Sequence, residues 1–135
     1  MKNSLRQIFV VSLGAMLVAV ATLPSGAAQR PAPLTRTYDG LWSVLIITRY
    51  GDCDPAYRYA VRIQGGRVIN SGEGQDYQVY GAVGRSGAIR VIVVRGGQWA
   101  DGSGRLSHNS GRGRWRTSTG QCAGDWTAAR RQSGR

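Results

Sequence analysis

Apolar and polar residues alternate along most of the chain after residue 37. The clearest example is 56–64, where Tyr57, Tyr59, Val61 and Ile63 share one face while Arg58, Ala60 and Arg62 share the other. Such alternation is typical of a β-strand with one buried and one exposed face. Glycine-rich turns separate similar segments. The pattern predicts strands over 41–49, 56–64, 67–71, 76–83, 88–95, 98–107, 113–117 and 122–130.

Short loops join these segments in sequence, which favours antiparallel neighbours. We therefore predict an all-β domain over 38–130, an eight-stranded antiparallel up-and-down barrel that leaves no strand edge unpaired. A β-sandwich is the alternative architecture. Eight strands enclose a lumen that side chains can fill or that holds one small ligand. The inward-facing candidates for such a lumen are Trp42, Tyr57, Tyr59 and Tyr77.

The N-terminal segment has the three parts of a secretory signal peptide. Two cations, Lys2 and Arg6, precede an uncharged apolar run over 8–21, and small residues follow up to Ala28. We expect 1–28 to be a cleaved signal helix, because the run is short for a membrane anchor. A flexible lead-in over 29–37 and a basic tail over 131–135 would flank the domain. The protein is thus expected in the periplasm or outside the cell.

Both cysteines of the chain, Cys53 and Cys122, follow the expected signal. An exported chain folds in an oxidising compartment, so an intramolecular disulfide is expected. Cys53 follows the first predicted strand and Cys122 opens the last. In a closed barrel these strands are neighbours, so the bond would lock the closing seam. Free thiols and an intermolecular bridge are the alternatives.

Arginine dominates the charge. The full chain has 18 Lys and Arg residues, 7 Asp and Glu residues and a net charge of +11, which becomes +9 once Lys2 and Arg6 leave with the signal. The alternation places a basic set on outward faces: Arg58, Arg62, Arg90, Arg112, Arg114 and Arg116. This charge favours anionic partners such as an envelope polymer or a lipid surface. Nucleic acid, which could stack on Tyr80 and Trp99, is disfavoured by export.

Two resemblances follow from short motifs. Gly40-Leu41-Trp42 resembles the Gly-x-Trp signature of lipocalin-type and avidin-type barrels. That likeness implies that Trp42 plugs one barrel end beneath Arg130 or Arg131.

A second likeness rests on four segments, 38–44, 53–59, 102–107 and 122–128, which resemble small exported proteobacterial proteins of no established activity. Some of these carry labels of haem utilisation or adhesion, and the resemblance implies no functional residues.

The residues do not assemble a catalytic or metal site. The one histidine, His108, stands in a predicted turn without a partner base, so we expect no enzyme activity, metal or cofactor. The expected function is a non-catalytic exported binding module for an anionic envelope surface or a small apolar ligand. The alternatives are a haem-binding protein, with His108 or a tyrosine as ligand, and a periplasmic protease-inhibitor-like barrel, in which 29–37 would reach the protease.

Overall fold

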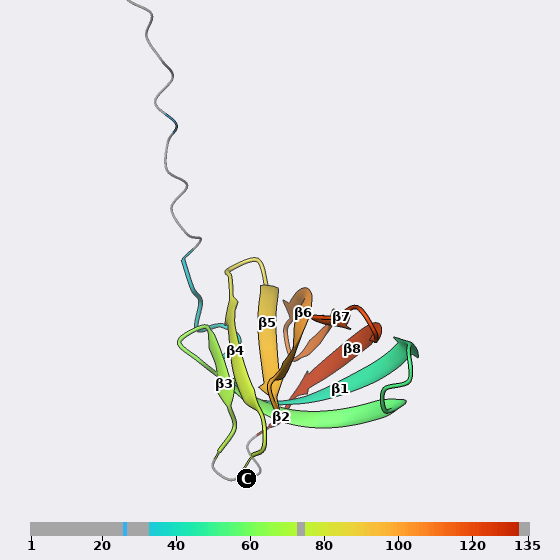
Figure 1. The fold of residues 1–135 in the computed structure, drawn as a ribbon. Helices are drawn as coiled ribbons and strands as arrows, with labels where there is room; N and C mark the ends of the chain where they lie inside the picture. Colours follow the sequence, from blue (N-terminus) through green and yellow to red (C-terminus); the bar gives the residue numbers. More distant parts are fainter. Residues whose placement is uncertain (1–25, 27–32, 73–74, 133–135) are drawn as a thin grey trace, which may run out of the picture. The chain divides into compact units, whose positions relative to one another are not determined.

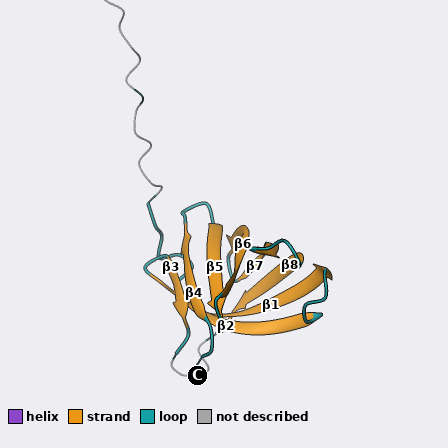
Figure 2. Ribbon diagram, viewed as in Figure 1, coloured by secondary structure: helices purple, strands orange, loops and turns teal. Residues whose placement is uncertain are grey.

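The computed structural model of the protein describes residues 26, 33–72 and 75–132, and this part of the chain forms a closed eight-stranded antiparallel barrel. The strands follow one another around the barrel in sequence order (Figure 1, Figure 2). They are β1 (Gly40–Tyr50), β2 (Ala56–Gln64), β3 (Arg67–Asn70), β4 (Gln78–Val83), β5 (Ala88–Arg95), β6 (Gln98–Ser107), β7 (Ser110–Thr117) and β8 (Ala123–Arg130). The predicted barrel is confirmed, and the sandwich alternative is wrong.

Strand pairing follows the side-chain alternation. Along β2 the apolar residues face the interior, while Arg58 and Arg62 are exposed. A register slip of one residue would move these arginines into the barrel, so the alternation specifies the register strongly. Three strands, β2, β5 and β6, have the bounds that the sequence predicted.

The predicted bounds are wrong for the other strands. The largest difference is β7, which begins at Ser110 instead of 113 because His108 adopts a positive φ of 54° in a short turn. That turn lets Ser110 pair with Ser107, so the β6–β7 ladder continues through glycines that resemble a loop in the sequence. The ends of β1, β3, β4 and β8 differ from prediction by one or two residues.

β1 and β8 close the barrel. Their ladder runs from Trp42 opposite Arg130 to Tyr50 opposite Ala123. Cys53 and Cys122 form a disulfide at the end of this ladder, so the predicted bond at the closing seam is confirmed. The disulfide ties the β1–β2 loop to the start of β8.

The seam between β3 and β4 is the weakest part of the wall. Only two cross-strand pairs are formed there, Arg67 with Ala82 and Val68 with Gly81. Beyond them the Asn70 side chain replaces the ladder: it donates to the Tyr77 carbonyl and accepts from the Val79 amide at 2.8 Å. A polar side chain thus supplies hydrogen bonds that backbone would otherwise make, which is why β4 begins at Gln78 and not at Asp76.

The expected signal helix over 1–28 lies outside the described residues, apart from Gly26. Within the expected lead-in, Leu34 forms an isolated bridge with Gly84, which attaches this short stretch to the β4–β5 turn. Of the expected tail, residues 131 and 132 are described and exposed. No helix in the described ranges is long and apolar enough to cross a membrane.

Candidate ligand-binding cavity

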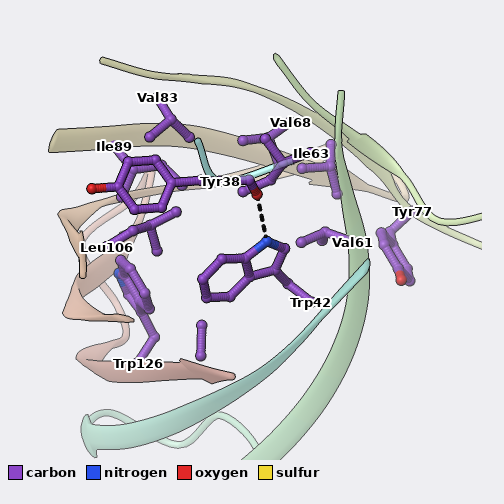
Figure 3. Close-up of a cluster of buried hydrophobic side chains, with 12 residues drawn as sticks. Tyr38, Trp42, Val61, Ile63, Val68, Tyr77, Val83, Ile89, Leu106 and Trp126 are labelled. Atoms are coloured by element: carbon purple, nitrogen blue, oxygen red, sulfur yellow. Dashed lines mark hydrogen bonds between the residues drawn. The ribbon is translucent and has the colours of Figure 1, made fainter. Parts of the chain in front are cut away.

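One end of the barrel is closed by Trp42. Its side chain is 1% exposed, and its indole N–H donates to the Tyr38 carbonyl at 2.8 Å (Figure 3). The Arg130 guanidinium covers the ring, 5.1 Å from the ring centroid, in a cation–π arrangement. Of the two arginines that the lipocalin- and avidin-type resemblance offered for this place, the structure therefore selects Arg130.

Arg130 also ties together the segments around the plug. It donates to the backbone carbonyls of Thr37 and His108, both at 2.9 Å, and of Asp39 at 3.1 Å. The Asp39 carboxylate in turn accepts from the amides of Gly65 and Gly66 in the β2–β3 turn. Apart from Arg130 Nε, which is buried without a partner among the described residues, these polar groups are satisfied within the protein and form a hydrogen-bonded floor.

Above this floor lies a cavity of about 470 Å³ within the barrel. Valine, isoleucine and leucine side chains from β1 to β6 form most of its wall. They are Val44, Ile46, Val61, Ile63, Val68, Val79, Ile89, Val91, Val93 and Leu106. The volume falls within the range of about 300–1,000 Å³ that is typical of small-molecule sites.

Trp126 shapes one side of this cavity by lying against glycines of β6 and β7. A Cβ placed on Gly113 or Gly104 would come within 2.6 Å of the Trp126 ring. The indole N–H donates to the Ser103 carbonyl at 3.3 Å, which holds the ring against the wall. The small residues along β6, expected to mark a close approach, therefore leave room for a large side chain that would otherwise fill the lumen.

Two tyrosines on β2 supply polar groups to the cavity. The Tyr57 and Tyr59 rings are tilted against each other with centroids 4.5 Å apart, and both line the cavity. In the part of the chain that the structure describes, neither hydroxyl has a hydrogen-bond partner, whereas the Tyr77 hydroxyl donates to the Ala60 carbonyl at 2.9 Å. Burial raises the pKa of Tyr59, and the neighbouring Tyr57 adds to this effect. Tyr59 is therefore a neutral hydroxyl at physiological pH.

Tyr77 lies behind Tyr59 instead of lining the cavity. The two rings meet edge to face with centroids 4.7 Å apart, and Tyr77 is 7% exposed. Figure 3 shows it apart from the plug around Trp42. Three of the four predicted lumen residues, Trp42, Tyr57 and Tyr59, line the cavity, and Tyr77 supports them from outside.

The mouth of the cavity is polar. The Arg95 guanidinium lies 5.7 Å from the Tyr57 ring centroid and pairs with Asp76 across the rim. Gln98 and Asp54 also line the opening. The hydrogen bond from Arg95 to Asp76 is the main reason that the pKa of Arg95 is raised, so this cation is permanent. An apolar chamber thus opens beneath a ring of hydrogen-bonding groups.

Sequence reasoning missed several cavity residues. Arg95, Trp115 and Trp126 line the cavity but are not among the predicted lumen residues. The Trp115 indole N–H donates to the Ile47 carbonyl at 3.1 Å, so the ring is anchored at the wall. The alternation places both tryptophans inside, but only the paired register shows that they border open space.

The six predicted basic residues all lie on the outer face and are exposed: Arg58, Arg62, Arg90, Arg112, Arg114 and Arg116. They do not gather at the cavity mouth. Arg116 pairs with Asp101 at 3.2 Å, and Arg58 donates to the Ser43 hydroxyl at 3.0 Å. Arg112 lies directly opposite Arg105, a like-charge pair on neighbouring strands.

His108 lies at the closed end, in the β6–β7 turn, and does not line the cavity. Among the described residues, no three side chains of the His, Cys, Asp and Glu types are grouped as metal ligands. Side-chain oxygen atoms at the cavity come from tyrosine and threonine hydroxyls, Gln98 and the rim carboxylates.

No family model matches the chain, and neither the curated proteins nor the solved structures give a significant match. The function proposed below therefore rests on the cavity.

Proposed function

We propose that this protein is a non-catalytic binding barrel that holds one small, mostly apolar molecule in its lumen. The observation that carries the proposal is the cavity of about 470 Å³, walled by apolar side chains and floored by Trp42. Natural cores are packed closely, and an open apolar space of this size costs stability. A ligand that fills it would recover the lost contacts.

The polar groups indicate how the ligand is oriented. The hydroxyls of Tyr57 and Tyr59 have no partner among the described residues, so a ligand acceptor such as a carbonyl or ether oxygen would satisfy them. Asp52 and Asp54 line the mouth and disfavour a strongly anionic group there. The best fit is a neutral molecule with a flat or branched apolar body and one or two oxygen atoms toward the mouth.

A neutral fluorophore, N-phenyl-1-naphthylamine, tests this proposal. We expect saturable binding of one probe per chain, with an increase in probe emission as it leaves water. Energy transfer from the tryptophans that line the cavity, Trp42, Trp99, Trp115 and Trp126, would report its position. The absence of saturable binding to the purified protein would overturn the proposal.

Two substitutions on β5 make the test specific. Val91 faces the cavity, whereas the adjacent Ile92 is 44% exposed on the outer face. Val91→Trp fills the lumen and should weaken probe binding at least tenfold, while Ile92→Trp should leave it unchanged. Equal binding by both variants would show that the probe sits elsewhere.

The same preparation distinguishes haem from other apolar ligands. A haem carrier would shift the Soret band on titration, and the shift would be lost in a Tyr57→Phe/Tyr59→Phe variant if a phenolate is the axial ligand. Probe binding without any Soret shift assigns the lumen to metal-free molecules.

A further inference from the structure

The outer face of β3–β6 carries a cluster of exposed apolar side chains, here called the wall patch. Its members are Ile69, Tyr80, Ile92 and Trp99, which are 39%, 57%, 44% and 45% exposed. They come from four consecutive strands, and Val94 lies among them. Scattered apolar residues are common on protein surfaces, but a contiguous set is typical of an interaction site.

The strand register brings these side chains together. Tyr80 lies directly opposite Ile92, and Val94 lies directly opposite Trp99. Ile92 and Val94 are two apart on β5 and therefore share its outer face. Ile69 and Tyr80 line one hollow at the β3–β4 seam. The wall patch thus extends across four neighbouring strands of the barrel wall.

Arginines surround the wall patch. Arg62 lies opposite Ile69, Arg67 lines the same hollow as Tyr80, and Arg90 lies two residues before Ile92 on the same face. In the described part of the chain, these three arginines make no ion pair. Asp101, which lies opposite Ile92, is paired with Arg116. An apolar surface with an unneutralised cationic border matches an anionic partner.

We propose that the wall patch docks on the surface of a membrane that contains anionic lipid. Tryptophan and tyrosine favour the boundary between headgroups and acyl chains, isoleucine and valine favour the acyl region, and arginine contacts lipid phosphates. Tyr80 on β4 and Trp99 on β6 flank the aliphatic pair Ile92 and Val94 on β5, which lies between these strands. Trp99 also lines the mouth of the cavity, so the wall patch reaches the rim of the lumen. The membrane proposal does not depend on the proposed ligand.

Other occupants fit less well. A second copy of the chain would bring two sets of Arg62, Arg67 and Arg90 into one interface, and like charges repel. A single-stranded nucleic acid would require successive aromatic platforms, whereas aliphatic side chains separate Tyr80 from Trp99 here.

Vesicle binding tests this inference. The full chain is mixed with vesicles of 70% phosphatidylcholine and 30% phosphatidylglycerol, and with pure phosphatidylcholine vesicles. We expect stronger binding to the anionic vesicles that weakens as NaCl is raised, because exposed charges are screened. Of the four tryptophans, only Trp99 is exposed, so quenching by brominated lipid reports contact at the wall patch.

Matched variants separate the patch from general charge. Arg67→Gln/Arg90→Gln should lower the vesicle partition coefficient about 25-fold, at about fivefold for each arginine. Arg58→Gln/Arg131→Gln removes the same charge from exposed positions outside the patch and should change the partition coefficient far less.

The apolar side chains are tested separately. Tyr80→Ser/Ile92→Ser should abolish quenching of Trp99 by brominated lipid, while Tyr50→Ser, at a residue 67% exposed at the end of β1, should not.

Three outcomes would overturn the proposal. They are no binding to anionic vesicles in low salt, equal losses in the two arginine pairs, and no quenching of Trp99. Val91→Trp should bind vesicles normally, so a failure of lumen binding and a failure of membrane docking can be told apart.

Discussion

The two ends of the barrel use the same eight strands in opposite ways. At the closed end Trp42 is almost fully buried, its N–H is satisfied by Tyr38, and Arg130 seals the ring. At the open end the hydroxyls of Tyr57 and Tyr59 face unfilled space and have no partner among the described residues.

This contrast separates stability from binding. Packed apolar side chains stabilise a fold, whereas unfilled apolar space destabilises it. Proteins accept such costs where a function needs them. The closed end should therefore carry most of the stability of the barrel, and the open end its binding.

The largest effect is expected at the floor. Trp42→Ala should lower the free energy of unfolding by about 3–5 kcal/mol, because it creates a large cavity beneath Arg130. Denaturant unfolding followed by circular dichroism measures this change. Trp99→Ala, at an exposed tryptophan, should cost less than about 1 kcal/mol. Equal costs for the two variants would show that the closed end is not the stabilising half.

The disulfide should come next. Replacing Cys53 and Cys122 by serine should lower the free energy of unfolding by about 2–5 kcal/mol, since the bond closes a loop between residues 69 apart in sequence. Because the bond lies at the open end, hydrogen exchange should accelerate more at Ile47 than at Ser43. Uniform acceleration along β1 would contradict the division between the two ends.

A smaller effect is expected where Trp126 meets the wall. Gly113→Ala should cost about 1–3 kcal/mol, because the new Cβ would come within 2.0 Å of the Ser103 carbonyl oxygen and within 2.6 Å of the Trp126 ring, so that both β6 and the ring must shift. Binding of N-phenyl-1-naphthylamine should weaken as well. Gly72→Ala, which meets nothing within 4 Å, is the control and should change neither property.

The smallest effect is a pH dependence at the open end. Burial raises the pKa of Tyr59 above its ordinary value, so the folded state holds this proton more tightly than the unfolded state. The resulting stability is fully present below the unfolded pKa and is lost as pH rises through the folded pKa, in the alkaline range. Unfolding midpoints measured across this range should fall less steeply for Tyr59→Phe than for the wild type. An unchanged slope would contradict burial of this hydroxyl.

Much of the fold was predictable because strand alternation is a local property. The faces of β2 and β5 follow from residues two apart, and the six basic residues lie outward as expected. The disulfide was predictable because only one pair of cysteines exists. Strand ends were less predictable where the deciding contact is remote, as at the β3–β4 seam, where Asn70 replaces backbone pairing.

Sequence alone determined the strand order, the inward and outward faces and the chemistry available to each. The tertiary structure decided which of these side chains come into contact. Closure brought Trp126 of β8 against Gly104 of β6 and Gly113 of β7, and this left the lumen open. Closure also placed Arg130 over Trp42 and grouped the wall patch from four strands. Empty volume and surface clusters depend on which distant residues meet, and no local pattern encodes that.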